Sequence, residues 1–572
     1  MTKIDAAAPL IPATADMDPA DQEWFRQAVF YALQVRTFAD ANADGIGDIS
    51  GLTGKLDYLQ WLGVDCVIVP PLFRSPMTDG GFDVADYYDI QPAVGTVEEF
   101  RQFVAAAHAR GLRVLMDFVL NHTSDQHPWF QRSRTDPEGP FGNFYVWADG
   151  AAEQDPDIYA EARVLSSDPE QSNWTFDEVR GQHYWHRFLP SQPDLNFDNP
   201  HVLDEVKNAF RFWLALDVDG FRLDAVSYLV EAEATTCENL PGTHQVLREL
   251  RALIDQEFPG RILVGEADQP LDEIVDYFGA GDECHMMLLF PLVPQLLLAV
   301  GQSTRAPLTD LLASTPRIPA TCQWATFLST HNEVALAMLS PPQRELLWSL
   351  YAPQPRMIHN LGIRRRLAGL LAGDIGRIRL LHGLILSLPG SPVLYYGDEI
   401  AMGDDIWLAD RDGVRTPMQW TAETGAGFSA AVLQDFAVPL VSDPDFAGVN
   451  VEDQFLDPGS LLVWLRSMLV IRRAHPVFGS GEITDLGGDN PAVLSFLRTH
   501  PDHPTVVCIN NFSPHQQQVV LDLTPFASAV PVDLLRAVTH RQIGSAPFEL
   551  SVRGHGLVWL RLPPAPPRER RS

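Results

Sequence analysis

Gly220-Phe221-Arg222-Leu223-Asp224-Ala225 follows a largely apolar run at 212–218 and sets a guanidinium two residues from a carboxylate. In a β-strand, side chains at i and i+2 point to the same face, so Arg222 and Asp224 are expected side by side. A neighbouring guanidinium favours the ionised carboxylate, as a nucleophile requires. Taken alone, such a pair is more often a structural ion pair, so its role depends on what surrounds it.

Seven other apolar, β-branched runs resemble this one, and stretches of helical periodicity separate them, such as 97–110, 202–216 and 243–258. This eightfold β-α alternation predicts an α/β fold, a closed parallel (β/α)8 TIM barrel. A doubly wound open sheet is the alternative, but no glycine-rich phosphate loop follows the first strand. The eight predicted strands are 28–38, 64–70, 113–120, 218–226, 261–267, 283–290, 325–331 and 392–396.

Two segments break this alternation. Residues 123–188, after the third strand, are rich in Asp, Pro and aromatic residues and predict an inserted subdomain B. Short alternating runs within 477–562 predict a C-terminal antiparallel β-sandwich. The catalytic barrel would then comprise 23–122 and 189–476, between a flexible leader at 1–22 and a disordered, Pro-rich tail at 563–572.

Charge and cysteine content narrow the classes of partner. The 74 acidic residues outnumber the 41 basic ones, so nucleic acid and anionic membrane surfaces would be repelled, and a neutral ligand is expected. The apolar run 286–300 is short and interrupted by prolines, which predicts buried core rather than a membrane span. Five scattered cysteines without C-x-x-C spacing, and no secretory signal, predict a cytoplasmic protein without a zinc site.

Polar residues gather where the predicted strands end, which is where barrel enzymes carry their catalytic groups. Two carboxylates with an arginine and two imidazoles, facing an uncharged ligand, fit glycosidic-bond chemistry. Asp224 would be the nucleophile and Glu266 the acid/base, about 5 to 5.5 Å apart in a retaining enzyme. The histidines would donate hydrogen bonds to sugar hydroxyls. The segments concerned are Asp117 to His122, Arg222 with Asp224, Glu266, and His331-Asn332-Glu333.

These strand ends resemble the motifs of the α-amylase superfamily, and Gln192-Pro193-Asp194-Leu195-Asn196 resembles a further motif of its oligo-1,6-glucosidase branch. Four longer stretches, 172–175, 237–241, 351–366 and 387–420, are similar to the trehalose synthases of that branch. The resemblance implies a retaining enzyme without an organic cofactor. It would interconvert maltose and trehalose through a glucosyl-Asp224 intermediate, with the released glucose turning inside a closed pocket. A homo-oligomer stays open, since relatives often self-associate.

The resemblance also implies individual roles. Asp224 and Glu266 would be catalytic. Arg411 is a weaker candidate for sugar binding, because such loop arginines often merely pair with acids. The other implied sugar contacts are Asp79, His122, Gln192, Arg222, His331 and Arg415.

Two structural Ca²⁺ sites are expected. Oxygen-bearing residues alternate after the first strand with a glycine for the turn, as a calcium loop needs, at Asp40, Asn42, Asp44, Ile46 and Asp48. An Asx-rich turn that binds nothing is the alternative. The resemblance implies a second site at Asn121, Asp194 and Glu231, with the backbone carbonyls of Tyr228 and Leu229.

The chain departs from the family at three positions. Asn332 stands where relatives carry a catalytic aspartate, so the hydrogen bonding is kept and the charge is lost. Phe82 replaces a tyrosine that stacks under the bound ring. Asp268 replaces the asparagine of trehalose synthases, so one amide has become acidic while one acid has become an amide.

Three explanations of Asn332 compete. It is an introduced substitution that traps substrate, or a natural change in which Asp268 supplies part of the missing charge. The second case allows an α-glucosidase or transglucosidase with another donor or acceptor. In the third case the chain is a weakly active or silent sugar-binding paralogue. The retention of Asp224, Glu266 and Arg222 argues against the third explanation.

Overall fold

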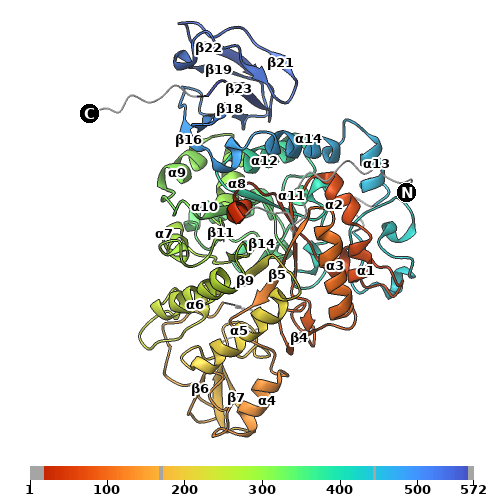
Figure 1. The fold of residues 1–572 in the computed structure, drawn as a ribbon, viewed down its shortest axis with the longest axis vertical. Helices are drawn as coiled ribbons and strands as arrows, with labels where there is room; N and C mark the ends of the chain where they lie inside the picture. The colour runs from red at the N-terminus through yellow and green to blue at the C-terminus, as the bar shows by residue number, and fades with distance from the viewer. Residues whose placement is uncertain (1–18, 166–171, 442–445, 565–572) are drawn as a thin grey trace.

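Eight parallel strands close into a barrel at the centre of the molecule (Figure 1). The computed structural model describes residues 19–165, 172–441 and 446–564. The predicted TIM barrel is confirmed, and each strand overlaps the run that predicted it. In order around the barrel the strands are β1 (Phe30–Ala32), β2 (Cys66–Val69), β5 (Arg113–Val119), β9 (Gly220–Asp224), β10 (Ile262–Gly265), β11 (Met286–Leu288), β12 (Gln323–Phe327) and β15 (Ser391–Tyr395).

The strands are mostly shorter than the runs that predicted them, and two of them show why the bounds shift. The first run is only partly extended, because a 3-10 turn, η3 (Val35–Thr37), follows β1. The seventh strand begins two residues early, at Gln323, a polar residue that periodicity discounts. Its side chain is buried and donates to Gly479 O at 3.0 Å, so the polar group is satisfied inside the core.

Helices cover the outside of the barrel. The three helical stretches expected from periodicity are α3 (Val97–His108), α5 (Pro200–Leu214) and α6 (Pro241–Glu257). Thr96 caps α3 by accepting from Glu99 N at 3.2 Å, which satisfies a free N–H of the first turn. The remaining helices are α1 (Ile49–Thr53), α2 (Leu56–Leu62), α7 (Leu271–Ile274), α8 (Leu292–Gln302), α9 (Ala306–Ser314), α10 (Pro341–Tyr351), α11 (Leu367–Leu370), α12 (Ile375–Ser387), α13 (Val451–Leu456), α14 (Leu461–Arg473) and α15 (Val477–Ser480).

The apolar run 286–300 is buried core, as predicted, since it forms β11 and most of α8. Within the described ranges, no helix is long and apolar enough to cross a membrane. Two hairpins lie outside the barrel sheet. They are β3 (Phe73–Arg74) with β4 (Asp86–Ile90), and β13 (Ile358–His359) with β14 (Gly362–Ile363).

The segment between the third and fourth barrel strands carries regular structure that periodicity did not reveal. It contains α4 (Pro128–Thr135) and a small sheet of β6 (Trp147–Ala148), β8 (Gln182–Trp185) and β7 (Trp174–Asp177). Trp174 and Trp185 pack edge to face, with ring centroids 4.9 Å apart, and form a separate small core. These strands are too short, at two to four residues, for alternation to be visible in the sequence.

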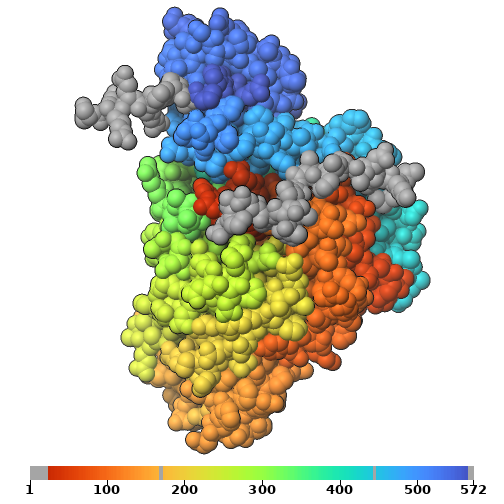
Figure 2. Space-filling view, in the orientation of Figure 1, coloured from red at the N-terminus to blue at the C-terminus, as the bar shows by residue number. Residues whose placement is uncertain are grey.

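The C-terminal part is antiparallel, as predicted, and forms two sheets that share a core. On β18, Val507 and Ile509 face the small sheet, whereas Val506 and Cys508 pack against the barrel domain. Figure 2 shows the two parts in contact. The larger sheet is β16 (Glu482–Asp485), β17 (Val493–His500), β18 (His503–Asn511), β23 (Leu557–Leu562), β20 (Val532–Asp533) and β21 (Val538–Thr539), and the smaller is β19 (Gln517–Leu521) with β22 (Phe548–Val552).

The predicted leader and tail fall largely on residues 1–18 and 565–572, which lie outside the described residues. Residues 19–22 of the predicted leader belong to the 3-10 helix η2 (Pro19–Arg26). The remaining domain limits stay a prediction.

The buried carboxylate of Asp219, directly before β9, links helix α3 to the barrel strand β5. Asp219 is fully buried and accepts from Val114 N at 2.9 Å and from His108 Nε2 at 2.8 Å. Burial lowers the pKa of His108, but hydrogen bonds with Asp217 and Asp219 outweigh it and raise that pKa to about 9. The imidazolium therefore stabilises the folded state at neutral pH.

We expect His108→Gln to lower the free energy of unfolding by roughly 1–3 kcal/mol near pH 6. Because the folded pKa exceeds the unfolded value, this contribution is complete below the unfolded pKa and disappears as pH rises through about 9. Urea unfolding of both proteins at pH 6 and pH 10 measures it. His201→Gln, at an exposed site on α5, is the control. An equal loss at both pH values would contradict the role of the charge.

Candidate active site

Three neighbouring strands bring the predicted catalytic carboxyl groups together. Arg222 on β9 pairs in register with Asp117 on β5. Its Nη1 donates to Asp117 Oδ2 at 2.5 Å, and its Nη2 pairs with Glu266, just beyond the end of β10. All three side chains are buried. Asp224 lies at the end of the same strand, beside Glu266.

The expected pairing of Arg222 with Asp224 is wrong in detail. Adjacent strands lie about 4.8 Å apart, whereas i and i+2 on one strand are about 6.6 Å apart, so the guanidinium meets the neighbouring strands first. Burial raises the pKa of Asp224 well above its usual range, and the charge on Glu266 adds to this, while Arg222 opposes both. Arg222 thus favours the ionised form of Asp224, as expected, while burial and the charge on Glu266 favour the protonated form.

The carboxyl groups share too little positive charge for all of them to ionise. Burial raises the pKa of Asp117 to about 7, against the opposing effect of Arg222. One guanidinium thus faces three carboxyl groups, which disfavours ionisation of all three at once.

A second polar cluster closes the other side of the barrel mouth. Arg411 Nη2 donates to Asp79 Oδ1 at 2.5 Å, and its Nη1 donates to Asn332 Oδ1 at 3.0 Å. Gln192 Nε2 donates to Asp79 Oδ2 at 3.1 Å. Arg415 donates to His331 O at 2.9 Å and to Asn332 Oδ1 at 3.4 Å. Arg411, the weaker candidate from sequence, thus joins Asp79, a predicted sugar-binding residue, to Asn332, which stands at the position of the family's catalytic aspartate.

The two predicted histidines are neutral donors in apolar surroundings. Burial lowers the pKa of His122 to about 4, and neither of its ring nitrogens has a partner in the described part of the chain. Burial also lowers the pKa of His331 well below its usual range, and nearby arginines add to the effect. The His331 ring stacks on Phe82, with centroids 5.1 Å apart and planes 12° apart. Phe82 therefore keeps a flat apolar wall without the family's hydroxyl.

Asp268 is the acid that departs from the family pattern. Its Oδ1 is buried without a hydrogen-bond partner among the described residues, and burial raises its pKa to about 7. Arg163 opposes the shift, while Glu333, Glu266 and Glu238 add to it. Asp268 therefore lies within the electrostatic reach of Glu266, the predicted acid/base, although it is itself only partly ionised at neutral pH.

Sequence reasoning missed the link between subdomain B and the barrel. Glu238 accepts from Arg163 Nε at 2.9 Å and from Arg187 Nη2 at 2.8 Å. Arg187 is almost completely buried, and no strand-end motif contains it. The only signal was indirect, because Glu238 falls in the stretch 237–241 quoted for the family resemblance.

The acidic loop after β1 holds itself together through its own backbone. Asp40 accepts from the backbone N–H groups of Asn42, Ala43 and Gly45, and Asp44 accepts from that of Ile46 at 2.9 Å. Asp48 caps α1 by accepting from Gly51 N at 2.6 Å. This is the pattern of an Asx-rich turn, which needs no ion.

The second predicted metal site carries unsatisfied oxygens. Asn121 Oδ1, Asp194 Oδ2 and Glu231 Oε1 are buried without partners in the part of the chain that the structure describes. Burial raises the pKa of Asp194 to about 8. Burial also raises the pKa of Glu231 well above its usual range, and the nearby charge of Asp194 adds to this shift. Tyr228 and Leu229 lie at the end of the adjoining 3-10 turn, η4 (Val226–Tyr228). A cation would relieve both carboxylates, so this donor set fits calcium.

No three Asp, Glu, His or Cys side chains in the described ranges converge to hold a metal. A cation at the second site would therefore depend on the Asn121 amide and on backbone carbonyls besides the two acids. Calcium uses such neutral oxygens readily, because it takes six to eight oxygen ligands.

Comparison with known proteins agrees with this geometry. Residues 33–481 match the α-amylase catalytic domain, and 485–559 match the maltogenic amylase C-terminal domain. A trehalose synthase of Pimelobacter sp. is 52% identical over 556 residues, covering 95% of this chain and 96% of that protein. The trehalose synthase/amylase TreS of Mycobacterium tuberculosis is 50% identical over 552 residues, covering 95% and 91%.

A solved structure, that of the α-glucosyl transfer enzyme XgtA, superposes with a TM-score of 0.76 at 29% identity, covering 94% of this chain and 99% of that one. The barrel with acidic strand ends therefore defines a glycoside-processing enzyme for small α-glucosides. The chain belongs to the α-amylase family, and trehalose synthases are among its relatives at about half identity.

We expect Asn332→Asp to raise kcat on 4-nitrophenyl α-glucoside by about 100-fold or more. The substitution is isosteric, and the new carboxylate would lie beside Arg411 and Arg415, which already donate to Asn332 Oδ1. Arg415 has no carboxylate ion-pair partner among the described residues, so the added charge is balanced. Absorbance of the released 4-nitrophenol measures the rate.

Asn208→Asp is the matched control, because the Asn208 amide oxygen also accepts from an arginine, on the exposed face of α5. Unchanged or lower turnover in Asn332→Asp would contradict the prediction. It would favour the second explanation, in which Asp268 supplies the charge, and Asp268→Asn should then reduce turnover.

Proposed function

We propose that the protein interconverts maltose and trehalose by moving one α-glucosyl unit within a closed pocket. Glu266 donates its proton to the glycosidic oxygen while Asp224 attacks the anomeric carbon, so that bond breaks and a glucosyl-Asp224 ester forms. The released glucose turns and presents another hydroxyl. Glu266 takes the proton of that hydroxyl, whose oxygen attacks the anomeric carbon, so that the bond from this carbon to Asp224 breaks and the carboxylate is freed.

The observation that carries the proposal is the shared guanidinium of Arg222. It joins Asp117 to Glu266 and keeps the acid/base beside Asp224. The neutral imidazole of His122 and the Asp79–Arg411 pair supply donors and acceptors for sugar hydroxyls. Relatives at about half identity are named as trehalose synthases, and this supports isomerisation over hydrolysis.

We expect maltose to be converted mainly to trehalose, and trehalose to maltose, with little free glucose. Ion chromatography after incubation with each disaccharide measures the products. Asp224→Asn should abolish conversion, because the amide cannot form the ester. Asp485→Asn, an exposed site on β16, should leave conversion unchanged. Glucose as the sole product would indicate an α-glucosidase, and no product would indicate a silent paralogue.

We further propose a structural Ca²⁺ held by Asn121, Asp194 and Glu231 with the carbonyls of Tyr228 and Leu229. The support is the set of unpartnered buried oxygens and the raised pKa values of the two acids. The ion would stabilise the base of subdomain B and take no part in the chemistry. The loop at Asp40 to Asp48 is the second candidate.

Chelator-treated protein should unfold at a lower temperature and regain its Tm on addition of Ca²⁺. Glu231→Gln should abolish that recovery and lower the calorimetric stoichiometry by one ion. Asp44→Asn is the matched change in the other loop. If Asp44→Asn alone lowers the stoichiometry, the assignment to Glu231 is wrong.

A reducing, cytoplasmic location is part of the proposal. The five cysteines are all buried and unpaired, as expected of a protein that does not rely on disulfides.

A further inference from the structure

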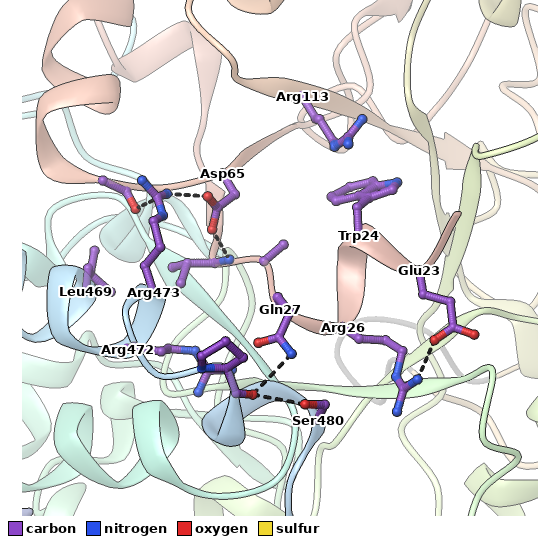
Figure 3. Close-up of a pocket in the computed structure, with 14 residues that line it drawn as sticks. Glu23, Trp24, Arg26, Gln27, Asp65, Arg113, Leu469, Arg472, Arg473 and Ser480 are labelled. Atoms are coloured by element: carbon purple, nitrogen blue, oxygen red, sulfur yellow. Dashed lines mark hydrogen bonds and ion pairs between the residues drawn. The ribbon is translucent and has the colours of Figure 1, made fainter. Parts of the chain in front are cut away.

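A cavity of about 420 Å³ opens at the N-terminal end of the barrel strands, away from the catalytic groups (Figure 3). It lies where the strands begin, since Val29 precedes β1, Asp65 precedes β2 and Arg113 opens β5. The helix η2 and the segment from α14 to α15 complete its wall. Its volume is within the range of small-molecule sites.

The wall of this cavity is basic, although the whole protein carries a formal charge of −33. Four arginines line it, against only Glu23 and Asp65. Arg473 pairs with Asp65, and Arg26 pairs with Glu23. Arg113 also pairs with the buried Asp219, at 3.6 Å, so the excess positive charge of the lining rests on Arg472.

Arg472 contributes a buried charge on which Asp65 acts only from beyond ion-pair distance. Its Nη1 donates to Leu386 O at 2.6 Å and its Nη2 to Gly390 O at 2.8 Å. It has no ion pair within the described ranges. Burial lowers its pKa to about 9, and the equally buried Arg498 adds to that shift. An anion nearby would therefore be stabilised by a charge that has lost most of its hydration.

At the rim of the cavity, two arginines keep N–H groups that are available as hydrogen-bond donors. Arg473 donates only through Nη2, and Arg26 only through Nη1, to acceptors in the described part of the chain. Both side chains are about one quarter exposed, at 27% and 26%. The planar guanidinium fork suits oxyanions, which it can bind with two hydrogen bonds.

The remaining wall is partly apolar, with Gln27 and Ser480 as its polar members. The guanidinium of Arg113 lies over the Trp24 ring, 4.3 Å from its centroid. Ala28, Val29 and Leu469 are buried beside them. A ligand that fits this cavity needs a compact apolar body as well as a negatively charged head.

We infer that this cavity binds a small ligand in which an anionic group is attached to a compact apolar body. The anionic group is either a phosphate monoester or a carboxylate. The site is separate from the proposed glucosyl-transfer site, because it lies at the opposite end of the barrel. Its occupancy would stabilise the fold by mass action, through contacts that join η2 to α14.

Calorimetric titration with phenyl phosphate at constant ionic strength tests the inference. We expect one saturable site per chain, unchanged in the presence of maltose. Gln27→Glu puts a carboxylate into the cavity in near-isosteric form and should weaken binding about tenfold or more. Gln518→Glu makes the same charge change on exposed β19 and should leave binding unchanged.

Benzoate serves as the second probe. Tighter binding of phenyl phosphate identifies a phosphate site, and tighter binding of benzoate identifies a carboxylate site. Arg26→Gln, which removes a rim charge, should weaken both. Non-saturable binding, displacement by maltose, or equal weakening in Gln27→Glu and Gln518→Glu would each overturn the inference. None of these outcomes bears on the maltose conversion assay, which tests the other site.

Discussion

The guanidinium of Arg222 is the group on which the active site depends. It is buried, and it joins carboxyl groups from the strands on both sides of its own. Burying an isolated charge costs several kcal/mol, and the cost is offset only when good geometry and further hydrogen bonds accompany the pair. Here one cation is placed among three carboxyl groups, and burial raises the pKa of Asp117 to about 7 and that of Asp224 well above its usual range.

The second constraint is the amide at 332. Its side-chain oxygen accepts hydrogen bonds from two arginines, as an aspartate at this position could. The hydrogen-bond geometry of the barrel mouth is therefore kept, although the negative charge of the carboxylate is missing. Asp268 carries a charge in the same mouth, but its pKa of about 7 leaves it only partly ionised at neutral pH. Partial ionisation limits how much of the missing charge it can replace.

Charge is distributed unevenly between the two ends of the barrel. The C-terminal ends of the strands gather carboxyl groups for catalysis, and the N-terminal ends gather arginines around an open cavity. The arginines at that end also hold the chain together, since Arg472 and Arg498 bind the backbone around β15 and α12. Arg472 thus both anchors α14 and lines the cavity.

The sequence by itself determined the barrel, because eight apolar runs with helical spacers permit few other ways of burying both faces of the strands. It also placed the polar strand ends at one mouth, since parallel strands share a direction. Tertiary structure alone decided which groups meet. Arg222 reaches across to Asp117 and Glu266 because strand neighbours are closer than i and i+2, and Glu238 meets Arg163 and Arg187 across a fold boundary. Contacts between residues far apart in the chain carry no periodic signal, so only the folded structure shows them.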